Sequence, residues 1–186
     1  DGTNYNTTWI DNYSTSNAQL VKASEAVNKG QVVYVSGADG TNMLVSKASN
    51  ASESASSTTI GVVNQTLAIN GQGYVVTEGL VTGFDTSAGA AGDPVWLGTA
   101  GNLLYGIANK PVAPAHLVYI GTVTRSHATN GAIFVNIGNG YELEELHNVL
   151  ITSPSDNQVL TYEASSSLWK NKTASGGSTS YVYMPA

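Results

Sequence analysis

Three histidines and a cluster of three glutamates are the residues of this 186-residue chain best suited to chemistry. The histidines are His116, His127 and His147. Their separations match no metal-ligand motif such as HxxxH, so we interpret each as a structural residue. The glutamates are Glu142, Glu144 and Glu145. Such a cluster can serve acid–base catalysis, but a solvated face near a helix N-terminus is the interpretation we prefer.

Other catalytic and binding motifs are missing from the sequence. Asp39–Asn42 (DGTN) lacks the alternating oxygen ligands and the closing Glu of a calcium loop, so it is interpreted as a β-turn. The sequence contains no GxSxG elbow and no phosphate loop ending in Gly-Lys-Ser/Thr. Cysteine is absent, which excludes disulfides and thiolate catalysis. We therefore expect a protein that is not an enzyme, with no cofactor and no metal.

The charge balance argues against two classes of partner. The chain has 7 Lys+Arg against 13 Asp+Glu, for a net charge of -6. Neutralising phosphates requires a basic surface, so nucleic acid is not expected as a partner. An anionic membrane surface is disfavoured for the same reason, and no apolar run is long enough to span a bilayer. The first residue is Asp1, and no cationic-then-apolar signal peptide opens the chain.

Most of the chain carries the pattern of short β-strands divided by glycine turns. Gln31–Ser36 (QVVYVS) and Tyr74–Phe84 (YVVTEGLVTGF) are rich in β-branched residues and Tyr, which favour strands. Asn70-Gly71 and Asn130-Gly131 tolerate the positive φ of tight hairpin turns. The spacing of these segments predicts an all-β fold, a sandwich or small barrel of short antiparallel strands.

One segment departs from this pattern. Tyr141–Leu150 (YELEELHNVL) follows the Gly138–Gly140 break, and its leucines at positions 143, 146 and 150 are spaced for one helical face. We expect a short helix or turn that opens a small second module. The predicted organisation is an N-terminal arm over 1–18, a β domain over 19–138, a small module over 139–174 and a flexible tail over 175–186.

The aromatic residues leave two interpretations open. The chain has 10 Tyr and 3 Trp but only 2 Phe. Tyr and Trp combine an apolar face with a polar group, which suits interfaces and sugar stacking, but they also pack well in ordinary sheets. In the polar arm, Trp9, Ile10 and Tyr13 are the expected anchors of a docking strand.

Several motifs resemble proteins of tailed-bacteriophage virions. The motifs of the β domain are Lys29–Val33 (KGQVV), Ile60–Val63 (IGVV), Gly73–Gly79 (GYVVTEG), Gly92–Trp96 (GDPVW), Gly121–Val123 (GTV) and Asn130–Val135 (NGAIFV). They are similar to β domains of capsid decoration proteins and fibre proteins. The motifs of the small module are Glu145–Val149 (ELHNV), Ser153–Tyr162 (SPSDNQVLTY) and Leu168–Asn171 (LWKN). They resemble a short module of phage fibres, although that module more often has Gly where this chain has Asn157.

The resemblance implies a virion component, usually trimeric, that is assembled in the host cytoplasm and carries no catalytic residues. The expected partners are copies of the chain itself, capsid or tail proteins, and host-surface glycan as a further alternative. The expected trimer interface is Leu143, Leu146, Val149, Leu150 and Trp169. A homotrimeric head or tail fibre is the leading interpretation, with a capsid decoration protein docked by its arm as the alternative and a glycan-binding module as a third.

Overall fold

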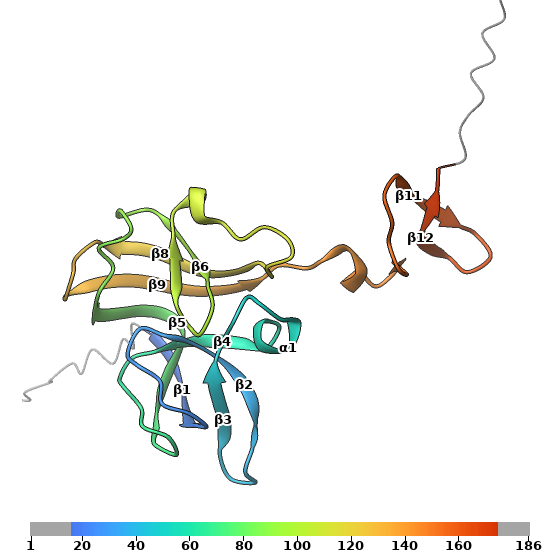
Figure 1. Cartoon of the computed structure of the whole chain (residues 1–186). Helices are drawn as coiled ribbons and strands as arrows, with labels where there is room; N and C mark the ends of the chain where they lie inside the picture. The colour runs from blue at the N-terminus through green and yellow to red at the C-terminus, as the bar shows by residue number, and fades with distance from the viewer. Residues whose placement is uncertain (1–15, 175–186) are drawn as a thin grey trace, which may run out of the picture. The chain divides into compact units, whose positions relative to one another are not determined.

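A computed structural model describes residues 16–174, which form two compact units that meet between Gly140 and Tyr141. The N-terminal unit contains β1 (Ser16–Ala23), β2 (Val32–Ala38), β3 (Met43–Lys47), α1 (Glu53–Ser56), β4 (Thr59–Val63), β5 (Gln72–Phe84), β6 (Pro94–Leu97), β7 (Leu103–Tyr105), η1 (Ile107–Asn109), β8 (Val118–Arg125) and β9 (Gly131–Asn139). The C-terminal unit contains η2 (Leu143–Glu145), β10 (Val149–Leu150), β11 (Gln158–Glu163) and β12 (Leu168–Thr173). The prediction of an all-β fold is confirmed (Figure 1).

The N-terminal unit combines a closed ring of strands with a second sheet. Strands β1, β3, β2, β4 and β5 pair in that order, and β5 pairs back to β1. The long strand β5 then continues into a second sheet in the order β5-β9-β8-β6-β7. In the ring every pairing is antiparallel except that of β1 with β3. Because β5 belongs to both, the ring and the second sheet share one continuous strand (Figure 1).

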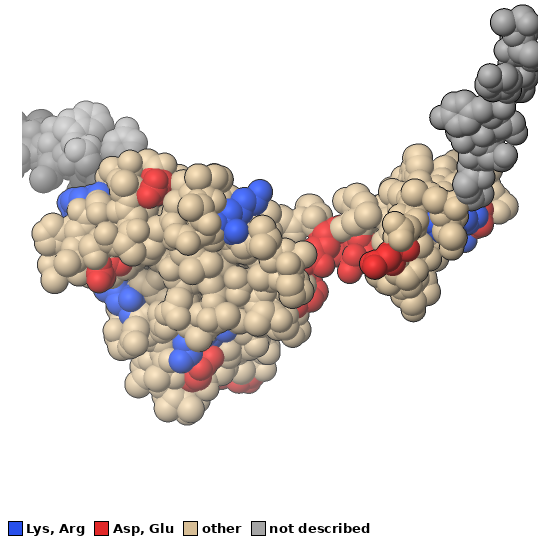
Figure 2. Space-filling model, turned by 45° about the horizontal axis from the view of Figure 1, so that its top comes forward, with Lys and Arg blue, Asp and Glu red and all other residues tan. Residues whose placement is uncertain are grey.

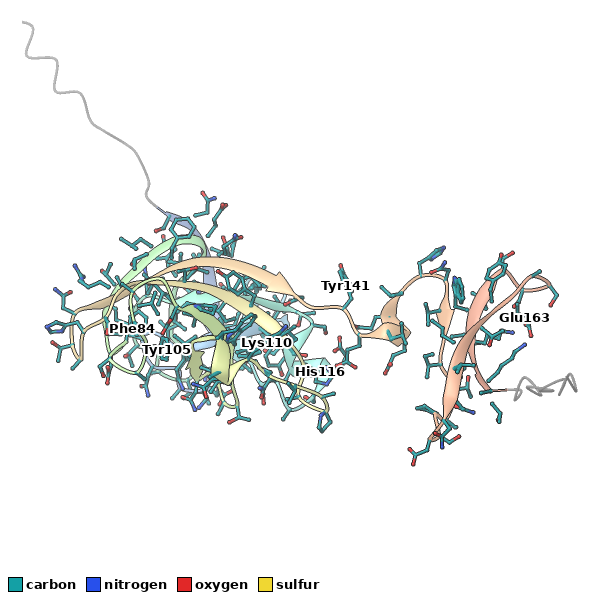
Figure 3. The ribbon with its side chains drawn as sticks, turned by 90° about the horizontal axis from the view of Figure 1, so that it is seen from above. Phe84, Tyr105, Lys110, His116, Tyr141 and Glu163 are labelled. Carbon is teal, nitrogen blue, oxygen red and sulfur yellow. The ribbon has the colours of Figure 1, made fainter. Side chains whose placement is uncertain are left out.

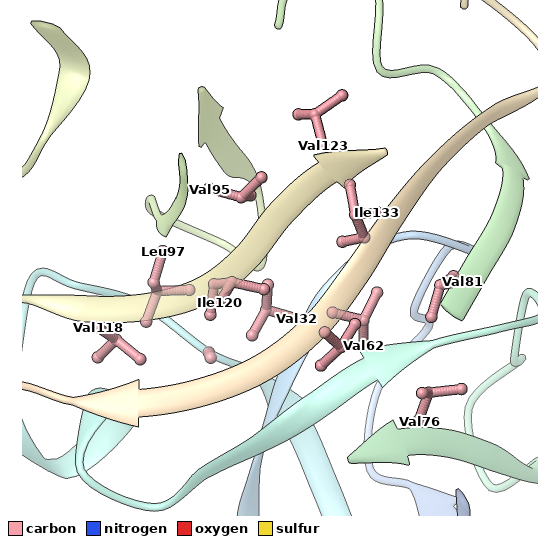
Figure 4. Close-up of a cluster of buried hydrophobic side chains, with 12 residues drawn as sticks. Val32, Val62, Val76, Val81, Val95, Leu97, Val118, Ile120, Val123 and Ile133 are labelled. Atoms are coloured by element: carbon pink, nitrogen blue, oxygen red, sulfur yellow. The ribbon is translucent and has the colours of Figure 1, made fainter. Parts of the chain in front are cut away.

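The strands between the two layers bury both of their faces. Strands β2, β4 and β5 each carry two successive valines, at 32–33, 62–63 and 75–76. Successive residues of a strand point to opposite faces. In each pair one valine enters the core inside the ring, and the other packs against Leu97, Ile120 and Ile133 of the second sheet (Figure 4). These valines are at most 2% exposed, so the pairs hold the two layers together.

The ring is built from two strand–loop–strand segments, β1–β2 and β4–β5, and strands of one segment pair with strands of the other. The connection from β1 to β2 and that from β4 to β5 lie against each other, and their backbones exchange two hydrogen bonds. The N–H of Val27 donates to the Leu67 carbonyl at 2.9 Å, and the N–H of Leu67 donates to the Val27 carbonyl at 2.8 Å. Each connection turns through a left-handed residue, Gly30 (φ 86) or Asn70 (φ 62). As a result, β1 pairs with β5 and β2 with β4, each across the two segments.

Three details differ from the sequence-based expectations. Asn70-Gly71 does turn the chain, but it does not close a two-residue hairpin, because the connection spans residues 64–71 and β5 pairs along most of its first half with β1. Strand β1 begins at Ser16, inside the range assigned to the arm. The segment over 141–150 contains one 3-10 turn followed by the strand β10, so its leucines do not share a helical face. Trp9, Ile10, Tyr13 and the tail over 175–186 lie outside the described residues.

Candidate functional site

The small sheet of the C-terminal unit has one apolar face. Its strand order is β10-β12-β11, and Trp169 in the central strand stands opposite Val149 on one side and Tyr162 on the other. Directly opposed residues project from the same face of a sheet, and so do alternate residues along one strand. The apolar face is therefore formed by Val149, Leu160, Tyr162 and Trp169. The Tyr162 and Trp169 rings pack with centroids 5.5 Å apart.

Nothing in the described part of the C-terminal unit covers this face. Tyr162 is 49% exposed, Leu160 40% and Trp169 39%. No side chain between Tyr141 and Ala174 is classed as buried, so this part of the C-terminal unit has no core of its own. Isolated small sheets are marginally stable in water unless they pack against something. Contiguous exposed apolar surface is a common feature of interaction sites.

The opposite face of the same sheet is charged and internally paired. The Glu163 carboxylate accepts hydrogen bonds from the ammonium groups of Lys170 and Lys172 and from the Ser166 hydroxyl. These bonds, with the Lys170 bond as the largest cause, lower the pKa of Glu163 from 4.5 to about 2. The two faces therefore differ in charge. The charged side chains of the sheet all lie on this face, which also carries Leu150 and Val159, whereas the apolar face includes the uncharged polar residues Gln158 and Asn171.

The Glu163 cluster predicts an acid-sensitive C-terminal sheet. Because the folded-state pKa is lowered, the stabilisation by the carboxylate is complete above pH 4.5 and is lost as the pH falls toward 2. We expect the Trp169 indole N–H signal in NMR spectra to lose dispersion across that window. In Glu163→Gln this acid-dependent step should be absent, because the amide does not titrate. An unchanged pH profile in the variant would contradict the role of the cluster.

The residues that the sequence suggested for an interface divide between several places. Val149 and Trp169 lie on the apolar face, whereas Leu150 stands opposite Lys170 and projects from the charged face. Leu143 and Leu146 belong to the η2 turn and are 49% and 43% exposed. The sequence analysis did not single out Leu160 and Tyr162. The alternation of Gln158, Leu160 and Tyr162 along one strand is the signal that could have identified them.

Four of the six residues first considered for chemistry, the histidines at 116 and 127 and the glutamates at 142 and 145, have structural partners. His116 Nδ1 lies 3.1 Å from a carboxylate oxygen of Glu53. His127 Nδ1 accepts hydrogen bonds from the backbone N–H groups of Thr129 and Asn130, at 3.1 and 3.0 Å. The Glu145 carboxylate accepts the backbone N–H of Glu142 and so caps the η2 turn. Among residues 16–174, no group of three His, Asp or Glu side chains is placed to hold a metal ion.

The Asp39–Asn42 segment forms the turn that joins β2 to β3. The Asp39 carboxylate accepts the backbone N–H groups of Asn42 and Thr41, at 2.8 and 3.1 Å, and the Lys22 ammonium at 2.9 Å. These bonds, that of the Asn42 N–H first, hold the pKa of Asp39 well below its usual range. Asp39 is therefore engaged in fixing the turn.

The surface of the described chain is sparsely charged. Figure 2 shows a mostly uncharged face with scattered basic and acidic side chains and one group of adjacent acidic side chains. In the part of the chain that the structure describes, no helix is long and apolar enough to cross a bilayer.

The chain was also compared with known proteins. No family model matches it, and no curated protein matches its sequence.

Proposed function

We propose that this chain is a non-enzymatic structural protein of a bacteriophage virion, assembled in the host cytoplasm as a homotrimeric head or tail fibre. The observation that carries the proposal is the uncovered apolar face of Val149, Leu160, Tyr162 and Trp169 on a unit without buried side chains. The resemblance of the two sets of motifs to phage virion proteins supports the assignment to a virion.

Copies of the same chain are the occupant that best fits the apolar face. Small folded units need a disulfide, a metal or association to be stable. The chain has no cysteine, and its described residues hold no metal-binding group, so association is the stabiliser that fits this unit. The lysines of the sheet already pair with Glu163 on the other face. An uncharged face of this kind matches the same face of another copy, where no charge has to be desolvated.

Assembly would also explain how such a protein works without catalysis. Three copies present every external contact three times, and linked weak contacts bind far more strongly than a single one. The closed ring leaves its own five strands without an exposed edge, and the second sheet ends at the three-residue strand β7, so little sheet edge is open in a protein that functions outside the cell.

The mass of the purified full-length chain tests the trimer. Native mass spectrometry should give three times the 19.2 kDa of one chain, and light scattering on a size-exclusion column should give the same mass in solution. A stable monomer across the concentration range of both measurements would refute the trimeric fibre.

Capsid decoration remains a second candidate, favoured by exposed apolar pairs on the N-terminal unit. Leu20 lies opposite Tyr74, and Leu80 lies opposite Phe134; all four are between 39% and 49% exposed. In a decoration protein these pairs would contact capsid subunits. Antibody labelling of intact particles separates the two functions, since a decoration protein is labelled over the whole capsid and a fibre at its attachment points. Leu80→Ser with Phe134→Ser should then lower capsid occupancy.

A further inference from the structure

A hollow on the N-terminal unit combines aromatic rings with polar side chains. It is an open depression of about 370 Å³, lined by residues from the β1–β2 connection, the end of β5 and the β6–β7 hairpin. Pockets of roughly 300–1,000 Å³ are the usual size of small-ligand sites. Phe84 and Tyr105 supply its aromatic part and lie near each other in Figure 3. We call this site the aromatic hollow.

Glycine backbones hold both rings in place. A Cβ on Gly30 would lie 2.6 Å from the Phe84 ring, and a Cβ on Gly89 would lie 2.9 Å from the Tyr105 ring. Each ring therefore packs directly on a backbone that has no side chain. The Tyr105 hydroxyl also donates to the Asp85 carbonyl at 3.3 Å, and burial together with the Asp85 charge raises the pKa of Tyr105 to about 12. The rings thus form a fixed surface before any ligand arrives, which reduces the entropic cost of binding.

Two side chains at the hollow have no side-chain partner within residues 16–174, and a third has one unbonded oxygen. Lys29 forms no ion pair or side-chain hydrogen bond, and the side-chain amide of Asn102 forms no hydrogen bond. Asp85 uses one carboxylate oxygen to accept the N–H and hydroxyl of Ser87, at 2.8 and 2.7 Å, which leaves its second oxygen free. Gln31 differs, because both ends of its side chain are bonded to the backbone. The hollow therefore offers a cation, a carboxylate oxygen and an amide beside two rings.

We propose that the aromatic hollow binds a pyranose sugar that carries a carboxylate, such as a uronic acid unit of a surface polysaccharide. The C–H face of the sugar packs on the aromatic rings, and its carboxylate accepts a charge-assisted hydrogen bond from Lys29. Its hydroxyls donate to the free oxygen of Asp85 and bond to the Asn102 amide, which both donates and accepts. A phosphate ester would bring nearly two negative charges next to Asp85, and a cationic ligand would face Lys29, so neither fits as well.

NMR titration of the ¹⁵N-labelled full-length chain tests the proposal. The probes are the methyl glycosides of glucuronic and galacturonic acid, each beside its neutral counterpart, the glucoside or the galactoside. We expect at least one acidic probe to shift the backbone amides of Gly30, Gly101 and Asn102. Its neutral counterpart should bind about tenfold more weakly, because a charge-assisted hydrogen bond is lost.

Matched variants locate the charge contact. Lys29→Met should weaken binding of the acidic probe about tenfold, to the level of the neutral sugar. Asn102→Ala should weaken both probes. Lys172→Met, which removes the same charge in the C-terminal unit, should leave binding unchanged. The proposal is overturned if no probe shifts these amides, if acidic and neutral sugars bind equally, or if Lys29→Met has no effect. Sugar binding is measured from the NMR signals of the N-terminal unit, whereas trimer formation is measured from the mass of the chain. The sugar-binding proposal and the trimeric-fibre proposal can therefore fail independently.

Discussion

Leu160→Asp is expected to convert the proposed trimer into monomers, whereas Leu150→Asp is expected to leave it intact. The two leucines are matched, since they are 40% and 45% exposed and occupy strands of the same small sheet. Leu160 lies on the apolar face, and Leu150 projects from the opposite face beside Lys170. A carboxylate at position 160 would be buried without a partner in each subunit, which costs at least about 3 kcal/mol, or more than about 100-fold in affinity per contact.

Native mass spectrometry of both variants and the unchanged chain provides the measurement, at equal protein concentration. The circular dichroism of both variants should retain the β signal of the N-terminal unit, which shows that a change in mass reflects assembly. If Leu160→Asp remains trimeric, the apolar face is not the interface. If Leu150→Asp alone dissociates, the trimer uses the charged face instead.

Gly121→Ala is expected to destabilise the N-terminal unit by about 3 kcal/mol, the upper end of the usual cost of overpacking. A Cβ at this position of β8 would lie 1.9 Å from the backbone carbonyl oxygen of Phe134 in β9. A backbone oxygen cannot rotate away as a side chain can, so β8 and β9 would have to separate where Gly121 pairs with Val135. That separation would disturb the contacts of Ile120 and Ile133, which are fully buried in the shared core.

Gly37→Ala is the matched control, because Gly37 lies in β2 with a φ of 158° against 156° for Gly121. No atom lies within 4 Å of a Cβ built on Gly37, so Gly37→Ala carries only the backbone strain that both positions share, and we expect it to cost about 1 kcal/mol. Urea denaturation of the full-length variants, followed by circular dichroism, measures both effects as shifts of the midpoint. Equal shifts in the two variants would show that backbone conformation, and not the close approach of β8 to β9, decides the cost.

Strand positions were well predicted from the sequence because the signals are local. The predicted strands over 31–36 and 74–84 correspond to β2 at 32–38 and β5 at 72–84, within two residues at each end. The left-handed conformation of Asn70 also follows from its residue type. The conformational preferences at these positions depend on neighbouring residues in the sequence, so they can be identified from one sequence.

The interaction face was only partly predictable. Trp169 and Val149 were expected at an interface, but the helical spacing of the leucines over 143–150 was misleading, since the helix stops after one turn. Leu160 and Tyr162 join the face only because β11 pairs with β12 in a register that sets Tyr162 opposite Trp169. A shift of one residue would have moved both to the charged face.

The sequence by itself determined the all-β class, the approximate positions of the long strands β2 and β5, and the absence of disulfides. The tertiary structure decided which strands pair. Strand β1 pairs with β5, and β2 pairs with β4, and both pairings join residues that are far apart in sequence. The tertiary structure also decided which valine of each pair enters which core, and it brought Phe84 and Tyr105 to one hollow. Strand propensity is a property of each segment alone. Strand pairing depends on the free energy gained when both faces of a strand are buried, and that free energy comes from contacts between several segments.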